Sequence, residues 1–364
     1  MKSVRLIFII LCASCFIQNS EAQIRKDSLP GRFMFIATPT AGYQPETSFS
    51  FGMVFFSTIR TGQNIEQSRL SNMELDILYT LKKQFIIDLD HNLYLLDNKL
   101  IAKGSNSRYR YPELFFGIGP ETSEIQSERI SANRIELDNS FLYELGPNIY
   151  GGLVQRFQQL RKLEFQENSP IVNAGITGIE GGISNGLGLG FVFDNRRNQI
   201  NPAPGRSFLD LSFTNFSKPF GSSYTFSRIE LDARRYFKAN KNNVLAVQMY
   251  GIFNTGNPPF RLTGMMGGSR IMRGYYHGRY RDRQYLSVQA EYRTHVYKRL
   301  GLVVFGGLGN VGNTKPKLLE TSPKYSLGTG IRFLLDKSNQ GNIRLDFALG
   351  KKSNGIYLSY GESF

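Results

Sequence analysis

Apolar and polar residues alternate through most of this sequence, and the alternation limits the folds open to it. Between residues 342 and 349, every second residue is large and apolar: Ile343, Leu345, Phe347 and Leu349. The residues between them are polar or small, and the pattern recurs at 228–234 and 286–293. Because side chains two residues apart lie on the same face of a β-strand, each segment has one apolar and one polar face. The sequence therefore predicts an all-β protein.

Residues 1–22 have the features of a signal peptide. Lys2 and Arg5 precede a mostly apolar run at 6–17, and the triplet at 20–22 gives the small-x-small pattern that signal peptidase cleaves. Removal of this segment leaves a net charge of (44 − 2) − (29 − 1) = +14. Both cysteines lie inside it, so the exported chain has no thiol for a disulfide or a soft metal. We expect a basic exported chain to meet lipid phosphates and anionic glycolipids, and no nucleic acid.

Three features favour a transmembrane barrel over a soluble sandwich, whose strands also alternate. The chain carries an export signal, and its alternating segments are about ten residues long, which suits a tilted strand that crosses a bilayer. Tyr360 and Phe364 fall on the apolar face of the last segment, where we expect a C-terminal assembly signal. No stretch after the signal approaches the roughly 20 apolar residues of a membrane-spanning helix. We therefore expect a transmembrane antiparallel β-barrel.

The barrel is expected to contain about 16 strands and to occupy residues 47–364 as a single domain. Residues 23–46, which contain several prolines, are predicted to form a periplasmic leader that enters the barrel or lies beneath it. Long connections are expected on the outside, as in other outer-membrane barrels. These connections lie at 59–71, 161–185, 255–283 and 311–323. The expected strands lie at 47–58, 72–82, 84–95, 98–105, 112–118, 129–145, 148–160, 186–195, 206–217, 225–237, 243–254, 284–298, 300–310, 324–335, 341–350 and 354–364.

The connection at 255–283 contains the most specific motif of the chain. It includes an aliphatic-Arg-Gly-aromatic tetrad, and five expected strands follow it. The tetrad consists of Met272, Arg273, Gly274 and Tyr275. With its flanking residues, it resembles the signature of the bacterial surface antigen family, the barrels of the BamA/TamA superfamily.

The resemblance extends over essentially the whole chain after the signal. The stretches 111–119, 188–197 and 201–206 are also similar to segments of that family. It implies a protein of the bacterial cell outer membrane that takes part in outer-membrane protein assembly or protein translocation, with its sixth outer loop folded into the lumen. Family members usually carry polypeptide-transport-associated domains before the barrel, whereas only about two dozen residues separate the signal from the first expected strand. The resemblance is therefore to the barrel without these domains.

We call the tetrad the latch, because Arg273 is expected to hold the loop inside the barrel. Its guanidinium offers five donors in a rigid fork, Gly274 permits a tight turn and Tyr275 is a flat apolar anchor. In the family, an aspartate on a later strand usually receives this arginine, and here Gly307 stands in its place. Glu291 is the first candidate acceptor, followed by three more remote acids, Asp232, Glu230 and Asp346. A basic loop solvated outside the barrel is the alternative interpretation.

No residue pattern supports an enzyme, a metal site or a cofactor site. Residues 182–186 match Gly-x-Ser-x-Gly, but a nucleophile elbow needs a helix after it, and an alternating strand follows here. The three histidines, His91, His277 and His295, are widely separated and lack the spacing of a metal site or a catalytic triad. We therefore expect no catalytic residue and no cofactor.

Three functions remain open at this point. In the first, the barrel acts on proteins, because its first and last strands pair weakly and a client strand adds to an exposed edge. The second is a passive pore, and the third is a structural or partner subunit of an outer-membrane complex. The expected partners are outer-membrane lipids and lipopolysaccharide, client outer-membrane or secreted proteins, and accessory subunits.

Overall fold

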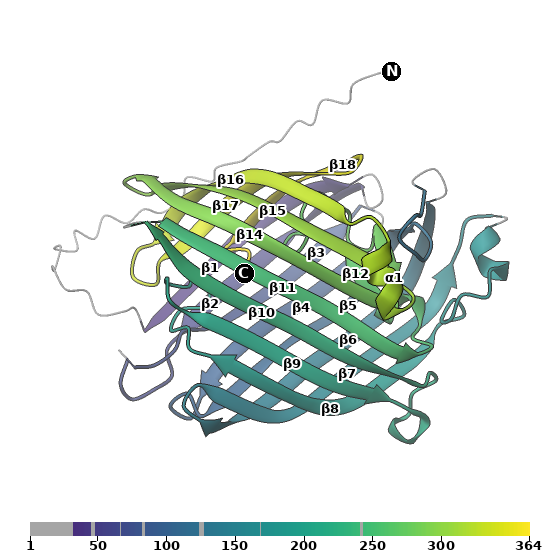
Figure 1. Cartoon of the computed structure of the whole chain (residues 1–364), viewed down its shortest axis with the longest axis horizontal. Helices are drawn as coiled ribbons and strands as arrows, with labels where there is room; N and C mark the ends of the chain where they lie inside the picture. The colour runs from purple at the N-terminus through teal and green to yellow at the C-terminus, as the bar shows by residue number, and fades with distance from the viewer. Residues whose placement is uncertain are drawn as a thin grey trace, which may run out of the picture.

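The computed structural model describes residues 32–44, 48–65, 67–81, 84–123, 127–167, 169–240 and 243–364. Sixteen strands form one large sheet in which strands pair in chain order, and every pairing is antiparallel (Figure 1). The strands of this sheet are β1 (Phe33–Gln44), β2 (Ser48–Ile59), β3 (Ser71–Thr80), β4 (Phe85–Leu95), β5 (Leu100–Phe115), β6 (Glu128–Gly146), β7 (Ile149–Glu164), β8 (Gly182–Asp194), β9 (Ser207–Phe216), β10 (Phe226–Asn240), β11 (Asn243–Gly256), β14 (Gln284–Tyr297), β15 (Leu300–Gly312), β16 (Lys324–Asp336), β17 (Gly341–Gly350) and β18 (Ser353–Tyr360). The predicted all-β fold of about 16 strands is confirmed.

The remaining elements are short and lie in the connections. The strands β12 (Gly264–Met266) and β13 (Tyr280–Asp282) pair with each other, and α1 (Lys315–Glu320) precedes β16. Single 3-10 turns are found at Pro170–Asn173, Lys218–Phe220 and Phe260–Leu262. In the described part of the chain, no helix is long and apolar enough to cross a membrane.

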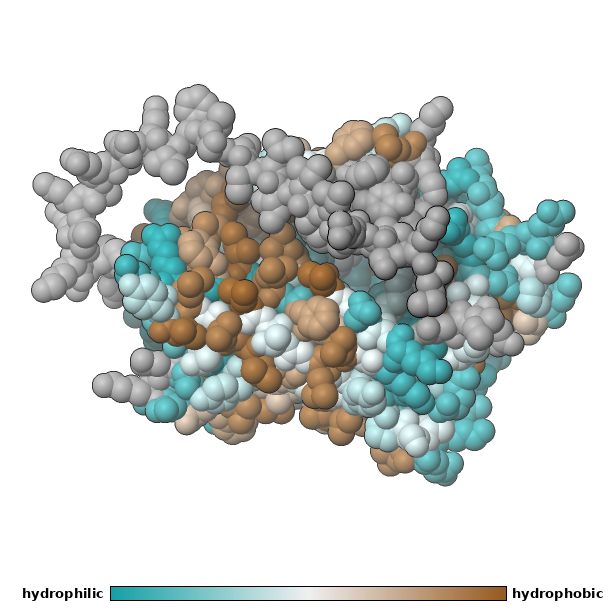
Figure 2. All heavy atoms as spheres, turned by 90° about the horizontal axis from the view of Figure 1, so that it is seen from above, coloured by the Kyte–Doolittle hydropathy of each residue, from teal (hydrophilic) through white to brown (hydrophobic). Residues whose placement is uncertain are grey.

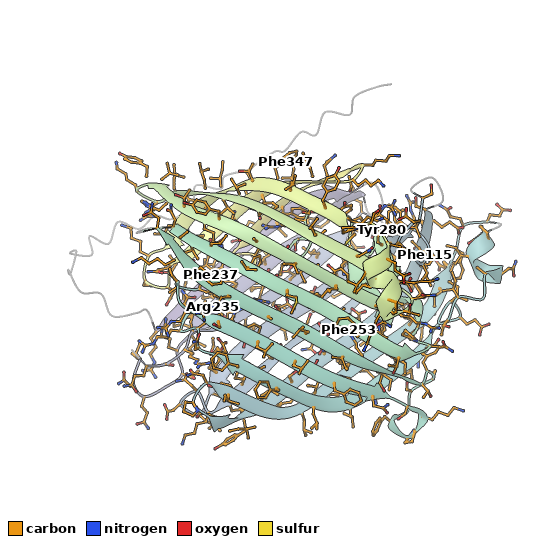
Figure 3. All side chains as sticks on the ribbon, in the orientation of Figure 1. Phe115, Arg235, Phe237, Phe253, Tyr280 and Phe347 are labelled. Carbon is orange, nitrogen blue, oxygen red and sulfur yellow. The ribbon has the colours of Figure 1, made fainter. Side chains whose placement is uncertain are left out.

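The two faces of the large sheet have opposite polarity. In β17, Leu345 and Phe347 are exposed, whereas Arg344 and Asp346 beside them are buried. Phe237 is also exposed, and Phe347 points away from the barrel at the top of Figure 3. Figure 2, which shows the molecule from above, has a broad apolar patch on the outer surface. An apolar outside around a charged inside is the reverse of a soluble protein, and it suits a barrel whose outer face meets hydrocarbon.

The first strand corrects the predicted domain boundaries. β1 pairs with β2 along its whole length, so residues 33–44 belong to the barrel and are not a leader. Arg32 is also described, whereas the rest of the predicted leader, at 23–31 and 45–46, and the predicted signal at 1–22 lie outside the described residues. A second correction keeps the number of strands at sixteen, because the two expected strands at 98–105 and 112–118 form one strand, β5.

Pro112 explains why β5 looked like two strands. Proline has no N–H to donate and interrupts a sheet where both neighbours are present. The pairing of β4 with β5 ends at Tyr109, however, and beyond it only β6 pairs with β5. Pro112 therefore lies where β5 has a single neighbour, a position at which a strand tolerates proline.

The added first strand also changes which connections share an end of the barrel. We call the end with the 257–283 connection the loop end, and the opposite end, where β18 finishes, the turn end. The connection at 60–70, expected outside, lies at the turn end. Arg69 donates to the Asn148 side chain (2.5 Å) in the β6–β7 turn, and the Leu70 N–H donates to the Arg197 carbonyl (3.3 Å).

The two edges of the sheet meet without strand pairing. Among the described residues, no backbone pairing joins β1 to β18. The Tyr360 ring at the end of β18 nevertheless lies 4.3 Å from the ring of Phe56 in β2, measured between centroids. The sheet is therefore curled into a barrel, and we call the junction between β1 and β18 the seam.

Candidate functional site

The connection at 257–283 folds into the barrel and packs on an apolar cluster. Met272 and Tyr275 are buried there with Met266, Tyr285 and Val311. The Tyr275 hydroxyl donates to the Tyr325 carbonyl (2.8 Å) and accepts from the Lys351 N–H (2.8 Å), so two hydrogen bonds hold the hydroxyl end of the ring. The latch therefore lies inside the protein, and the alternative of a solvated outer loop is not what the structure shows.

Gly274 is required by the close approach of the latch to β17. Its φ is +100°, a conformation that favours glycine. A Cβ at this position would lie 2.8 Å from the backbone carbon of Leu349. A larger residue would push the loop away from the barrel wall.

Arg273 lies between two carboxylates inside the lumen. Its guanidinium is 1% exposed and forms ion pairs with Glu291 on β14 and Asp346 on β17. The guanidinium also stacks over the Phe305 ring, 3.5 Å from the centroid. A buried cation is stable only if it is paired and hydrogen-bonded, and Arg273 has both kinds of partner.

The two carboxylates belong to a closed ring of alternating charges, which we call the charge ring. Glu291 also pairs with Arg293 (2.7 Å), and Asp346 also pairs with Arg332 (2.5 Å). Glu362 completes the ring, 2.8 Å from Arg332 and 3.6 Å from Arg293. The members of the ring are Arg273, Glu291, Arg293, Glu362, Arg332 and Asp346. It joins the loop, three strands and the C-terminal residues into one network of ion pairs.

The structure brings two of the four candidate acids to Arg273 and places the other two elsewhere. Glu291 and Asp346 contact it directly. Glu230 instead pairs with Arg156 and Arg228, and Asp232 pairs with Arg234. Both lie on β10, and their ion-pair partners are arginines other than Arg273.

Gly307 is explained by the packing of the latch itself. A Cβ at Gly307 would lie 2.9 Å from the Cβ of Gln289 and 3.1 Å from the Met272 sulfur. This position has no room for an aspartate, and Asp346 on β17 supplies the second carboxylate instead.

The C-terminus corrects the expected position of Phe364. β18 ends at Tyr360, and Gly361, with a φ of +78°, turns the chain into the lumen. Phe364 is 3% exposed and packs on Tyr236 and Ala246, while its carbonyl accepts from Arg293 (2.9 Å). The expectation that Phe364 lies on the outer apolar face is therefore wrong.

Tyr360 also turns away from the outer face, since its ring packs on Phe56 and Ile200 inside the barrel. Glu362 carried a signal of this turn. In a continuous strand it would share the apolar face with Leu358 and Phe364, where a charge does not belong. That conflict indicates that the strand ends before Glu362, and it could have identified this member of the charge ring.

At the loop end, the β5–β6 connection covers the folded loop. The Gly119 N–H donates to the Arg281 carbonyl (2.8 Å), and Arg279 donates to the Thr122 hydroxyl (2.9 Å). Phe115 and Tyr280 lie close to this junction in Figure 3. Burial lowers the pKa of Arg281 to about 10, and nearby Glu113 acts in the opposite direction, so the guanidinium stays charged at neutral pH.

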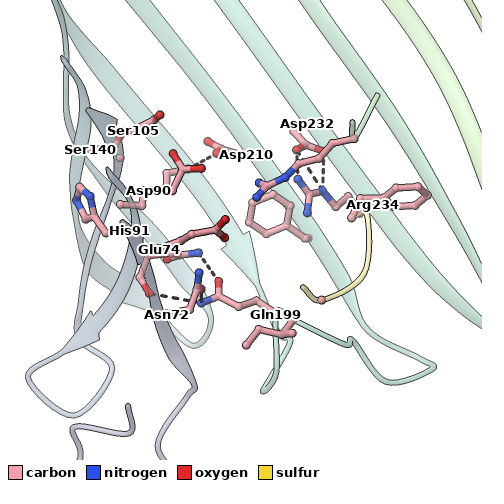
Figure 4. Close-up of a pocket in the computed structure, with 18 of the residues that line it drawn as sticks. Asn72, Glu74, Asp90, His91, Ser105, Ser140, Gln199, Asp210, Asp232 and Arg234 are labelled. Atoms are coloured by element: carbon pink, nitrogen blue, oxygen red, sulfur yellow. Dashed lines mark hydrogen bonds and ion pairs between the residues drawn. The ribbon is translucent and has the colours of Figure 1, made fainter. Parts of the chain in front are cut away.

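A polar cavity of about 430 Å³ remains in the lumen beside these segments. Figure 4 shows carboxylates and basic groups from several strands around it, among them Asp90, Asp210, Asp232 and Arg234. Among the described residues, no group of three or more His, Cys, Asp or Glu side chains converges as a metal site. Three segments partly fill the lumen: the 257–283 connection, residues 195–206 and the C-terminal residues. The cavity is the part of the lumen that they leave open to water.

Comparison with solved structures gives the same fold at low sequence identity. BamA from Haemophilus ducreyi lacking POTRA domains 1–3 matches with a TM-score of 0.54 and 14% identity, over 90% of this chain and 69% of that one. CdiB from Acinetobacter baumannii matches with a TM-score of 0.55 and 12% identity, over 90% and 59%. CdiB from Escherichia coli matches with a TM-score of 0.57 and 9% identity, over 92% and 62%.

Comparison with curated protein sequences gave no match. The family model described as the Omp85 superfamily domain matches residues 81–364, which include β4 to β18, the latch and every member of the charge ring. The match covers well over half of the chain, and the chain therefore belongs to the Omp85 superfamily.

Proposed function

We propose that this protein acts on other proteins at the bacterial outer membrane, in outer-membrane protein assembly or in protein translocation. Membership of the Omp85 superfamily and the likeness of the fold to BamA and CdiB support a role of this class. The client proteins are outer-membrane or secreted proteins, and the lipids and lipopolysaccharide of that membrane surround the barrel. Nothing in this role requires a cofactor.

The unpaired seam is the observation that carries the proposal. Each edge strand presents a row of backbone donors and acceptors, and an incoming β-strand adds to such an edge. The two edges also differ in length, because β1 has 12 residues and β18 has 8. A seam of unequal strands gains less from closing on itself than one of matched strands, so a client strand competes for the edge more easily.

The latch and the charge ring support this function by stiffening the wall next to the seam. Arg273 links the loop to β14 and β17, and Glu362 lies two residues after the end of β18. A rigid wall on the β14–β18 side leaves β18 in a defined position as a template. Pre-organised edges bind an extended peptide with less loss of conformational entropy.

A passive pore receives less support from the structure. The 257–283 connection, the residues 195–206 and the C-terminal residues all occupy the lumen. A structural subunit that handles no client remains the alternative, and it is separated from our proposal by the following experiment.

Photo-crosslinking in the native membrane tests the proposal at three outward-facing positions. A crosslinking residue replaces Phe35 in β1, Leu358 in β18, or Leu153 in β7 as a matched lipid-facing control. We expect pulse-labelled, newly made outer-membrane or secreted proteins to crosslink at 35 and 358 and to disappear during the chase, with no such products at 153. Equal labelling at all three positions, or none at the seam, would show that the edges do not receive clients.

A further inference from the structure

The connection between β8 and β9, at 195–206, reaches both sides of the seam from the opposite wall of the barrel. Asp194 and Arg196, at the start of this connection, form a buried ion pair (2.9 Å). Asp194 also accepts a hydrogen bond from the Tyr94 hydroxyl (2.5 Å). The Arg196 guanidinium stacks 3.9 Å from the centroid of Phe208. These contacts direct residues 196–201 into the lumen at its turn end.

On the first side of the seam, Gln199 binds strands β3 and β4. Its amide N–H groups donate to the Leu70 carbonyl (2.9 Å) and to the Asn72 side chain (2.6 Å). Its carbonyl oxygen accepts from the Asn92 side chain. Figure 4 shows Gln199 directed at Asn72, with the hydrogen bond between the two side chains drawn. One side chain therefore joins the connection to two strands near the first edge.

On the other side of the seam, three hydrogen bonds reach the last strands. The Asn198 side chain donates to the Asn339 carbonyl (2.6 Å), and the Asn201 side chain donates to the Gln340 carbonyl (3.1 Å). The Ile200 carbonyl accepts from the Glu362 N–H (2.8 Å), just after β18. Residues 198–201 thus contact the β16–β17 turn and the C-terminal residues.

Ile200 fills the space between the two sides. It is buried against Phe56 and Leu70 from the first side and Tyr360 from the last. Two further contacts between described residues cross the seam at this end, the tilted ring contact of Phe56 with Tyr360 and a hydrogen bond of 3.5 Å from Arg60 to Asn339. The connection therefore supplies most of the polar contacts that hold the edges together there.

We propose that residues 196–201 form a clasp, which closes the seam from inside the barrel in place of pairing between β1 and β18. The seam opens only when the clasp leaves its contacts on one side. That an open seam serves client strands rests on the function proposed above, whereas the clasp itself does not. Control of opening then lies with a segment that starts on the far wall of the barrel.

Isosteric variants test the clasp with little change in shape. Asn198→Asp keeps the side-chain oxygen that accepts from the Ile200 N–H (2.9 Å) but loses the donor to Asn339. Gln199→Glu keeps the acceptor for Asn92 but loses the donors to Leu70 and Asn72. The matched control is Asn215→Asp, which removes a hydrogen bond to Ser227 (2.9 Å) between β9 and β10, away from the seam.

Hydrogen exchange of the purified barrel in lipid nanodiscs measures seam opening without any client. In the Asn198→Asp, Gln199→Glu double variant, we expect amides of β1, β2 and β18 to exchange at least about tenfold faster, because several hydrogen bonds across the seam are lost. Amides of β6 and β7 should not change, and Asn215→Asp should match the unmodified protein at the seam. Unchanged exchange at β18 in a folded double variant would overturn the clasp.

If the double variant does not fold, the single variant Gln199→Glu is measured in the same way, with the same two outcomes. The crosslinking experiment separates the clasp from the proposed function. Faster exchange at the seam with no client crosslinks at position 358 would leave the clasp standing and reject the function. Unchanged exchange with client crosslinks at 358 would do the reverse.

Discussion

At the scale of single residues, the alternation of the sequence shows which side chains enter the lumen but not which of them meet there. Glu291 was identified as the first partner of Arg273 because it lies on the inward face of the strand after the loop. Asp346 was a remote candidate, yet it contacts Arg273 equally directly. Contacts across a lumen depend on how far each strand is rotated around the barrel, and a period of two residues carries no such information.

The charge ring predicts the effect of removing its central cation. Arg273→Ala leaves Glu291 and Asp346 buried beside a cavity, and loss of one partner of a buried ion pair costs about 3–5 kcal/mol. We expect protease to cleave the 257–283 connection faster in this variant and in Glu291→Gln. The double variant should be no worse than the poorer single one, because both changes break the same network.

The matched control for this prediction is Glu230→Gln, which removes a lumenal carboxylate that pairs with Arg156 outside the ring. It should leave cleavage of the loop unchanged. Additive effects of Arg273→Ala and Glu291→Gln would contradict a shared network.

At the scale of elements, most strands could be predicted because one face is apolar and the other is polar. β1 escaped because large apolar residues lie on both its faces, with Phe33 and Phe35 on one and Met34 and Ile36 on the other. Its Pro39 also suggested a leader, but a proline is tolerated in an edge strand that pairs on one side only. The alternation is therefore weak in β1, one of the two strands with a single neighbour, although it is clear in β18.

The C-terminal residues form an element that the last alternating segment concealed. Phe364 is buried in the lumen, so we expect Phe364→Ala to lower the stability of the folded barrel by about 3–5 kcal/mol, as for other buried aromatic rings. The measurement is the urea concentration at which the folded gel band disappears. Phe347→Ala, on the lipid-facing side, is the control and should change it less.

The same substitution tests the expected assembly signal. If Phe364 acts only as a signal read during assembly, Phe364→Ala lowers the amount of barrel in the membrane while the purified folded protein keeps its stability. That result would contradict a stabilising role of the buried ring.

At the scale of the whole molecule, sixteen antiparallel strands are held at their seam by side chains instead of a backbone ladder. The number of strands was predicted correctly although one strand was missed, because a different strand was counted twice. The seam itself was expected from the family resemblance, whereas the clasp was not. A connection that crosses the mouth of a barrel has no periodicity that a sequence could reveal.

The architecture predicts how the purified protein behaves on a gel. Mature protein folded in detergent should run faster before boiling than after, and its circular dichroism should be dominated by strand, because most described residues lie in one curled sheet. A single band at all temperatures, or a spectrum dominated by helix, would contradict the fold.

The inward C-terminus has a practical consequence for anyone who handles this protein. Phe364 is 3% exposed and its carbonyl is engaged by Arg293. An affinity tag fused after Phe364 would begin inside the lumen, and it could reach solvent only by pulling the last residues out of their contacts. Measurements on such a tagged protein would then report a loosened seam and overestimate how readily the barrel opens. A tag is better inserted in a surface loop such as 217–225.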